Sequence, residues 1–266
     1  MKDRLDVILT KKGLLPSREK AKASIMAGVV YVDGIRVDKP GTPVDTEAEI
    51  SVKEETCPYV SRGGLKLEKA LREFHISPEG ARAADIGAST GGFTDCMLQN
   101  GAVSVTAIDV GYGQLDWKLR NDPRVINMEK TNIRYFDTDD MEGDLDLITI
   151  DVSFISLKLV LPVAARLLSY EGSIVCLVKP QFEAGRDQVG KKGIVRDTSV
   201  HMEVIENVAA YGAENGLYVW GLSFSPVKGT KGNIEYLMHL RKKPAQRDIT
   251  QQDIRQTVAA SHEQLS

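Results

Sequence analysis

The stretch that most constrains the fold spans residues 84–93 and reads Ala-Asp-Ile-Gly-Ala-Ser-Thr-Gly-Gly-Phe. An apolar run ends at Asp85, small residues follow, and a helix-like segment then begins. This order of strand, tight turn and helix is typical of the first unit of a doubly wound α/β sheet. Because small residues let the backbone approach a ligand and a helix start has unpaired N–H groups, the turn is a candidate ligand site.

The turn does not fit the fingerprint of a dinucleotide site. The G-x-G-x-x-G pattern would need a second glycine where this chain has Ser89, and the sequence contains no G-x-x-x-x-G-K-[ST] loop for a diphosphate. The next apolar run ends at Asp109, at about the spacing of an acid that accepts ribose hydroxyls. We therefore predict a ligand that contains adenosine and lacks a diphosphate, in preference to a purely structural turn.

Strand-like and helix-like segments alternate after this turn, which predicts a mostly parallel α/β sheet. The short connection at 226–232 predicts that the last two strands pair antiparallel. A parallel sheet with an antiparallel last strand is typical of Rossmann-like class I methyltransferases and differs from the all-parallel sheet of dehydrogenases. The predicted strands after Asp85 cover 103–109, 125–127, 145–150, 173–178, 217–225 and 233–240, and the predicted helices cover 91–100, 115–119, 157–168 and 200–215.

Composition limits the kinds of partner. The formal net charge of -3 over 266 residues gives no overall basic field, so contacts with nucleic acid would need local basic patches. The three cysteines, Cys57, Cys96 and Cys176, have no metal-type spacing, and we expect reduced thiols and no metal site. The N-terminus lacks an apolar signal segment, and no apolar run approaches the roughly 18 residues that span a bilayer. We therefore expect a cytoplasmic protein without a membrane partner.

The first 52 residues carry the signals of a small α+β domain. Helices are predicted at 4–12 and 17–27, a hairpin at 29–37 and a strand near Ile50. Basic residues along the two helices could contact a phosphate backbone, although from charge alone we interpret them as solvated helix faces.

The order of these signals resembles the S-four RNA-binding domain of ribosomal and RNA-modifying proteins over about residues 3–52. The residues that carry the resemblance are Arg4-Leu5-Asp6, Gly13-Leu14, Ser17-Arg18, Ala21, Ile25, the run from Gly28 to Gly34, and Pro40. The resemblance implies binding of structured RNA through the helical face. The RNA contacts that it implies are Arg4, Lys11, Lys12, Arg18, Lys20 and Lys22.

These features predict four segments. They are an RNA-binding domain at 1–52, a linker at 53–60, a catalytic domain at 61–242 and a polar tail at 243–266 without evident chemistry. Within the catalytic domain, the basic, glycine-containing segment 183–197 is either a substrate lid or an ordinary surface loop.

Polar side chains end several of the predicted strands. Four of them, Asp85, Asp109, Asp151 and Lys179, each follow an apolar run, and the carboxyl ends of parallel strands meet at one crevice. A lysine that ends a buried strand is costly unless an acid pairs with it, and Asp151 is the obvious partner. Lys66 lies near the start of a predicted helix, where a positive charge opposes the helix dipole and indicates another use.

Six motifs resemble the TlyA family, whose members are often labelled haemolysins. They are Ser61-Arg-Gly-Gly-Leu-Lys66, Asp85-Ile-Gly-Ala-Ser-Thr-Gly-Gly-Phe93, Asp109-Val-Gly-Tyr-Gly-Gln-Leu115, Asp151-Val-Ser-Phe-Ile-Ser156, Leu177-Val-Lys179-Pro-Gln-Phe-Glu183 and Gly232-Asn-Ile-Glu235. The resemblance implies an S-adenosylmethionine-dependent methyltransferase with an FtsJ-like domain. It implies 2'-O-methylation of ribose, usually of cytidine, in ribosomal RNA. The family's catalytic tetrad falls on Lys66, Asp151, Lys179 and Glu235.

The chemistry of ribose methylation fits this tetrad without a metal. A ribose hydroxyl must lose its proton as it attacks the methyl sulfonium, and a lysine that burial and a neighbouring cation keep neutral can accept that proton. We expect Lys179 to be this base and Lys66 to be the neighbouring cation or to orient the hydroxyl. Asp151 and Glu235 would hold the two ammonium groups.

The residues expected to bind S-adenosylmethionine lie beyond the strand ends. The turn would wrap the methionine and ribose portion, Asp109 would accept the ribose hydroxyls, and Val110 would flank the adenine. Asp85 would face the cofactor amine, and Thr131 and Asn132 would contact the adenine edge. The predicted cofactor site comprises Asp85, Gly87, Ala88, Ser89, Thr90, Gly91, Gly92, Phe93, Asp109, Val110, Thr131, Asn132 and Asp151.

Two other classes of protein compete with this interpretation. A nicotinamide-dependent oxidoreductase can use the same sheet, but Ser89, the antiparallel last strand and the N-terminal RNA-binding signals disfavour it. A pore-forming haemolysin is disfavoured because the sequence has no amphipathic membrane hairpin, spanning segment or export signal. The sequence leaves open the methylated nucleotide, the ribosomal subunit, the oligomeric state and whether the cofactor pocket forms before RNA binds.

Overall fold

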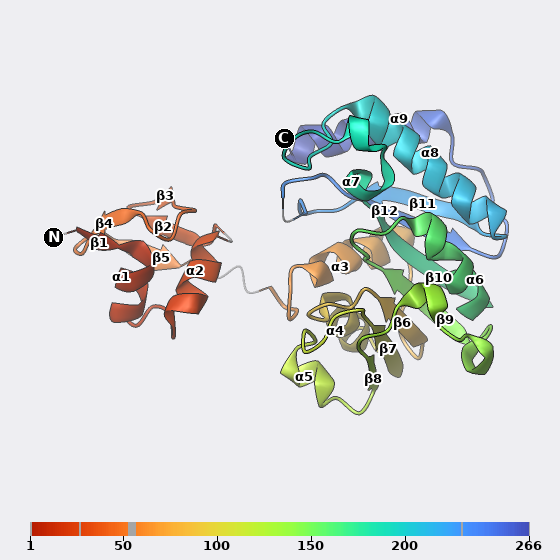
Figure 1. The fold of residues 1–266 in the computed structure, drawn as a ribbon, viewed down its shortest axis with the longest axis horizontal. Helices are drawn as coiled ribbons and strands as arrows, with labels where there is room; N and C mark the ends of the chain where they lie inside the picture. The colour runs from red at the N-terminus through yellow and green to blue at the C-terminus, as the bar shows by residue number, and fades with distance from the viewer. Residues whose placement is uncertain (1, 27, 53–56, 230, 266) are drawn as a thin grey trace. The chain divides into compact units, whose positions relative to one another are not determined.

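The chain folds as two compact units, residues 1–57 and 58–266, each with its own hydrophobic core (Figure 1). The computed structural model describes residues 2–26, 28–52, 57–229 and 231–265. Residues 53–56 of the predicted linker lie outside the described residues. Residues 58–60, which we predicted to complete the linker, belong to the second unit: Tyr59 is buried, and the Val60 N–H donates to Asp95 Oδ2 (2.9 Å).

The first unit contains the two helices and the hairpin that the sequence predicts. Its elements are β1 (Lys2–Arg4), α1 (Leu5–Lys11), α2 (Arg18–Met26), β2 (Val30–Val32), β3 (Ile35–Arg36), β4 (Pro43–Asp45) and β5 (Ile50–Val52). β2 pairs antiparallel with both β3 and β5, and Leu5, Leu9, Ile25 and Val30 form the buried centre. The pairing of β1 with β4 was not predicted, because three-residue strands are too short to show a period of two.

Asp6 is a buried carboxylate that joins the two helices of this unit. It accepts from Arg4 Nε (3.0 Å) and Arg18 Nη2 (3.0 Å), whose side chains are about half exposed. The hydrogen bond from Arg4, with a further contribution from Arg18, outweighs burial and lowers the pKa of Asp6 to about 2. Two of the predicted RNA contacts therefore also stabilise the fold of this unit.

A seven-stranded sheet forms the second unit, in the order β11-β12-β10-β9-β6-β7-β8 (Figure 1). The strands are β6 (Arg82–Ile86), β7 (Ser104–Ile108), β8 (Val125–Met128), β9 (Leu145–Ile150), β10 (Leu168–Val178), β11 (Tyr218–Phe224) and β12 (Tyr236–Arg241). Neighbouring strands are parallel except that β12 runs antiparallel to both β10 and β11. This confirms the predicted mostly parallel sheet with an antiparallel last strand. β12 does not close the sheet at its edge, because the β11–β12 hairpin inserts β12 beside β10.

Helices cover both faces of this sheet (Figure 1). Successive residues of β6 show this: Asp85 accepts hydrogen bonds from Thr94 of α4, whereas Ala84 and Ile86 join the core that contains Leu161 of α6 and residues of α8. The helices are α3 (Gly63–Phe74), α4 (Gly92–Gln99), α5 (Trp117–Arg120), α6 (Leu161–Leu167), α7 (Pro180–Glu183), α8 (Thr198–Glu214) and α9 (Gln251–Leu265). Short 3-10 turns are η1 (Ile133–Tyr135), η2 (Asp139–Met141), η3 (Leu157–Leu159) and η4 (Arg186–Gln188).

The structure differs from the prediction at two places in this unit. The helix predicted at 157–168 is interrupted: η3 is followed by α6, which has Pro162 at its start, and Leu168 already belongs to β10. Proline favours the first turn of a helix and disfavours its interior. The tail that we predicted to be polar forms α9, which packs on α8 and β11. Ile254 and Val258, four positions apart, are its buried apolar residues, and so short a stripe gives a weak sequence signal.

We predict that Asp6→Asn destabilises the first unit by about 1–2 kcal/mol at pH 7, because it removes a charged acceptor from two guanidinium groups. The pKa of Asp6 is lowered to about 2 in the folded state, below the value of about 3.9 expected in the unfolded chain. The stabilisation is therefore present above the unfolded pKa and is lost as the pH falls through the folded pKa. The free energy of unfolding of the first unit is measured by titration with urea at pH 7 and pH 3, with hydrogen exchange of the α1 amides as the probe.

Asp38→Asn, at an exposed position of the same unit, is the control. It should leave the free energy of unfolding unchanged at both pH 7 and pH 3. If Asp6→Asn retains the acid dependence of the wild type, Asp6 is not its source.

Candidate active site

The carboxyl ends of β6, β9 and β10 surround a cavity of about 500 Å³ in the second unit. The segment that leads into β12 completes its wall, because an antiparallel strand begins at the edge where parallel strands end. The predicted site residues that line the cavity are Lys66, Asp85, Gly87, Ala88, Ser89, Thr90, Gly92, Phe93, Asp151, Lys179 and Glu235. Five predicted cofactor residues are not among the lining residues: Gly91, Asp109, Val110, Thr131 and Asn132.

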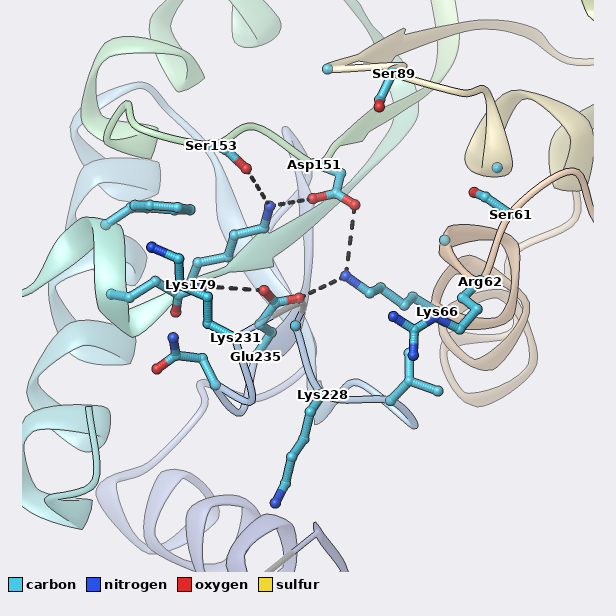
Figure 2. A pocket seen from close by; sticks show the side chains of 18 of the residues that line it. Ser61, Arg62, Lys66, Ser89, Asp151, Ser153, Lys179, Lys228, Lys231 and Glu235 are labelled. Atoms are coloured by element: carbon cyan, nitrogen blue, oxygen red, sulfur yellow. Dashed lines mark hydrogen bonds and ion pairs between the residues drawn. The ribbon is translucent and has the colours of Figure 1, made fainter. Parts of the chain in front are cut away.

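The four predicted catalytic residues form one chain of ion pairs (Figure 2). Lys179 Nζ lies 2.5 Å from Asp151 Oδ1, and Lys66 Nζ lies 3.8 Å from Asp151 Oδ2 and 2.7 Å from Glu235 Oε2. The side chains are 8% exposed for Lys179, 12% for Lys66, 4% for Glu235 and 21% for Asp151. Two positive and two negative charges compensate one another, which offsets the desolvation cost of burying them.

Each member of this tetrad has a local reason for its position. Lys66 lies in the first turn of α3, which contains no acidic residue. Glu235 supplies a negative charge that compensates both Lys66 and the positive end of the helix dipole. Glu235 directly precedes β12 and also accepts from Gln181 Nε2 (3.2 Å). A Cβ at Gly229 would meet the Glu235 carboxylate, so a larger residue there would displace this carboxylate from its contacts. Lys179 directly follows β10 and also donates to Ser153 Oγ (3.2 Å).

The glycine turn allows the ends of β6 and β9 to approach each other closely. Gly87 has a φ of 87°, and a Cβ at this position would lie 2.6 Å from the backbone oxygen of Asp151. Gly91, which is not in the cavity wall, has a φ of 92° and packs against Leu115 and Leu119 of the α5 region. Gly87 therefore shapes the cavity, whereas Gly91 lets the start of α4 pack closely.

Asp85 is buried beneath the turn. Its carboxylate accepts from the Thr94 N–H (2.9 Å), the Thr94 hydroxyl (2.7 Å) and the Thr149 hydroxyl (3.0 Å). Burial raises the pKa of Asp85 to about 6, and the hydrogen bonds from the two threonines oppose that rise. Three protein donors thus already hold the carboxylate in the cavity wall, and its contact with a cofactor amine stays a prediction.

Asp109 organises the other predicted cofactor residues beside the turn. Its carboxylate accepts from the Ser89 N–H (2.8 Å) and the Gly111 N–H (2.7 Å), and its backbone oxygen accepts from the Thr131 N–H (2.9 Å). The side-chain oxygen of Asn132 caps η1 by accepting from the Arg134 N–H (3.1 Å). Val110 is 70% exposed. These residues gather next to the turn but outside the wall of the cavity.

Several residues of the cavity wall were not among the predicted site residues, including Arg62, Ser153, Phe154, Lys228 and Lys231. Phe154 is 87% exposed with a φ of 64°, and its ring lies 5.0 Å from that of Phe182. Figure 2 shows the three basic side chains around the same cavity. The sequence positions of these residues could have identified them. Ser153 and Phe154 follow Asp151, and Lys228 and Lys231 lie in the connection at 226–232. Val189 and Gly193 bring the segment 183–197 into the wall as well.

The six predicted RNA contacts of the first unit are all exposed. Besides the pairs of Arg4 and Arg18 with Asp6, Lys11 Nζ lies 2.9 Å from Asp3 Oδ2 and Lys12 donates to the backbone oxygen of Ala48 (3.2 Å). These contacts leave positive charge at the surface of the unit, as RNA binding would require.

The described part of the chain gives no sign of a metal centre. Cys96 and Cys176 are buried cysteines outside any disulfide, and Cys57 is partly buried. In residues 2–26, 28–52, 57–229 and 231–265, no three or more His, Cys, Asp or Glu side chains are grouped to hold a metal ion. Over the same ranges no helix is long and apolar enough to cross a membrane.

Comparison with protein families agrees with the fold. The model of FtsJ-like methyltransferases matches residues 59–242, and the S4 domain model matches residues 3–50. The second unit is therefore an FtsJ-like methyltransferase domain. The chain belongs to the TlyA family of rRNA methyltransferases, also named hemolysin A.

Individual relatives are similar over nearly their full lengths. YqxC of Bacillus subtilis is 52% identical over 268 residues, covering 99% of this chain and 95% of that protein. The 16S/23S rRNA (cytidine-2'-O)-methyltransferase TlyA of Mycobacterium tuberculosis is 46% identical over 239 residues, covering 90% and 89%. Hemolysin A of Brachyspira hyodysenteriae is 43% identical over 237 residues, covering 89% and 98%. A solved structure from Streptococcus thermophilus is 51% identical, covers 99% of this chain and 96% of that one, and has a TM-score of 0.79.

We predict that Gly87→Ala impairs the enzyme more than Gly113→Ala. Both glycines have a positive φ, so each substitution strains the backbone by about 1–2 kcal/mol. Only at Gly87 would the new Cβ meet the Asp151 backbone, whereas nothing lies within 4 Å of a Cβ at Gly113. Gly87→Ala should therefore lower methyl-transfer activity by a further factor of about ten or more, because the catalytic residues shift. Thermal unfolding and activity of both variants measure this, and equal losses would contradict it.

Proposed function

We propose that this protein uses S-adenosylmethionine to methylate the 2'-hydroxyl of a cytidine ribose in ribosomal RNA. The observation that carries the proposal is the largely buried chain of two lysines and two carboxylates next to the glycine turn. The relatives support it, because the Mycobacterium tuberculosis protein is named as a 16S/23S rRNA (cytidine-2'-O)-methyltransferase.

The residues of this chain fit S-adenosylmethionine. Gly87 to Phe93 present a backbone turn that carries no bulky side chain before Phe93, and a Cβ at Gly87 would disturb the cavity wall. Beside the turn, the Asp109 carboxylate is held by two N–H groups and suits the two ribose hydroxyls as an acceptor. Val110 offers an exposed apolar surface for the adenine. When bound, the cofactor would supply a methyl group activated by a sulfonium.

Lys179 would act as the general base. In its neutral form the amine accepts the proton of the ribose hydroxyl, and Asp151 at 2.5 Å then stabilises the ammonium. Lys66, held by Glu235, keeps a positive charge on the other side of Asp151 and would orient the hydroxyl. The protein thus contributes a positioned base and a positioned substrate, which is the main demand of an in-line transfer.

The cavity mouth has features that suit an unstacked nucleotide. The exposed ring of Phe154, supported by Phe182, offers a face on which a base can stack. Arg62, Lys228 and Lys231 add positive charge in the cavity wall, where the neighbouring phosphates would bind. The first unit would supply further contacts to structured RNA, and ribosomal subunits in the cytoplasm are the proposed substrates.

Methyl transfer from labelled S-adenosylmethionine to ribosomal subunits that lack the modification tests the proposal. Wild-type protein should label a single ribose and make that position resistant to alkaline cleavage. Lys179→Ala should lower the rate by about a hundredfold or more, because general-base catalysis contributes at least that much. Binding of S-adenosylhomocysteine should be retained.

Lys243→Ala is the matched control, since Lys243 pairs with Glu171 and is not part of the cavity wall. Label on a nucleobase would contradict ribose methylation, and absence of label on every ribosomal particle would contradict the RNA substrate.

We also predict that the double substitution Lys20→Ala, Lys22→Ala weakens binding to ribosomal subunits. Both lysines are exposed on α2, and loss of two phosphate contacts should reduce the slope of log affinity against log salt by about 2. Filter binding at several salt concentrations measures the slope. Lys243→Ala should leave it unchanged, and an unchanged slope in the double variant would remove these lysines from the RNA interface.

A further inference from the structure

Glu183 is a partly buried carboxylate that is neither in the tetrad nor among the residues of the cavity wall. It is the last residue of α7, which begins directly after Lys179. Its Oε2 accepts from the Ser156 hydroxyl (2.6 Å), and its Oε1 accepts from the Leu157 N–H (2.8 Å). Burial raises the pKa of the Glu183 carboxyl, and the two hydrogen bonds oppose that rise. Glu183 therefore ties α7 to the segment that follows β9.

That segment, residues 151–157, follows β9 and contains Asp151 of the tetrad. At its start the Asp151 N–H donates to the backbone oxygen of Ile86 (2.9 Å). At its end the two contacts with Glu183 hold Ser156 and Leu157, where η3 begins. The segment is thus attached at both ends, and its middle faces the cavity with Ser153 and Phe154.

Phe154 needs such support because its backbone is strained. A φ of 64° in a residue with a bulky side chain costs about 1–2 kcal/mol and persists only where the surroundings hold it. Three contacts join this segment to residues 179–183 on the cavity side: Asp151 with Lys179, Ser153 with Lys179, and Phe154 with Phe182. The two hydrogen bonds to Glu183 add to these contacts, and Glu183 lies outside the cavity wall.

We propose that Glu183 is a positioning residue for the nucleotide side of the active site. It holds residues 151–157 in the conformation in which Ser153 meets Lys179 and Phe154 stands at the cavity mouth. This inference rests on the proposed function, since it assigns Phe154 to the nucleobase and Lys179 to the ribose hydroxyl of the target nucleotide. Of the predicted cofactor residues only Asp151 lies in this segment, and its N–H is bonded to Ile86 at the end away from Glu183. Loss of Glu183 should therefore impair RNA methylation and leave cofactor binding unchanged.

Two substitutions in the full-length protein separate positioning from charge. Glu183→Leu removes both acceptor oxygens. Glu183→Gln keeps one oxygen that can accept from the Leu157 N–H, and its amide NH2 group can donate a hydrogen bond to the Ser156 hydroxyl. Glu183→Leu should lower kcat for methyl transfer to ribosomal subunits by about tenfold or more, because the base and the nucleotide lose their alignment. Glu183→Gln should restore kcat to within about threefold of the wild type, and both variants should bind S-adenosylhomocysteine with wild-type affinity. Glu206→Leu, at an exposed position on α8, is the control.

Hydrogen exchange tests the same inference without RNA. The amides of residues 152–157 should exchange faster in Glu183→Leu than in the wild type, and neither Glu183→Gln nor Glu206→Leu should show this. If the wild type methylates no RNA, the proposed function fails, while the exchange result still decides whether Glu183 holds the segment.

Three results of the methylation and cofactor-binding assays would overturn the inference. They are wild-type kcat in a folded Glu183→Leu protein, an equal loss of cofactor affinity and kcat, or damage by Glu183→Gln as large as that by Glu183→Leu. Unchanged exchange at residues 152–157 in Glu183→Leu would also overturn it.

Discussion

The mutual compensation of four largely buried charges is the constraint on which the second unit depends. Lys66, Asp151, Lys179 and Glu235 are held in one cavity wall, and removal of one carboxylate would leave a buried lysine without compensation at a cost of several kcal/mol. Lys66 and Glu235 are 169 positions apart in the sequence. They meet because β12 is antiparallel and therefore begins at the edge where β6, β9 and β10 end.

Close backbone approach is the second requirement of this cavity. Gly87 brings β6 against the Asp151 backbone, and Gly229 leaves room for the Glu235 carboxylate. Both glycines act on acids of the tetrad, so the turn that first suggested a ligand site also supports the catalytic side chains. Outside the cavity wall, Glu183 supports the site by its hydrogen bonds to the segment that contains Ser153 and Phe154.

The sequence predicted the elements with clear periodicity and missed those without it. The seven strands and the helices α3, α4 and α8 were expected, since each has several apolar residues at the right spacing. β1 and β4 are too short to show a period, and α9 has only a narrow apolar stripe. At the site, the residues predicted from the turn and the tetrad were brought together. Thr131 and Asn132 instead lie beside Asp109, where the Thr131 backbone and the Asn132 side chain are used in local hydrogen bonds.

By itself the sequence determined the class of sheet, the acids and the lysine at the strand ends, and the family whose motifs it carries. These properties follow from local patterns of apolar residues, glycines and charges, which can be read along the chain. Only the tertiary structure decided that Lys66 lies close to both Glu235 and Asp151 and that Asp85 is already held by Thr94 and Thr149. It also decided that Glu183 supports the segment after β9. These contacts join residues from different elements of the sheet unit. Their distances depend on strand order and register, which no local stretch of the sequence specifies.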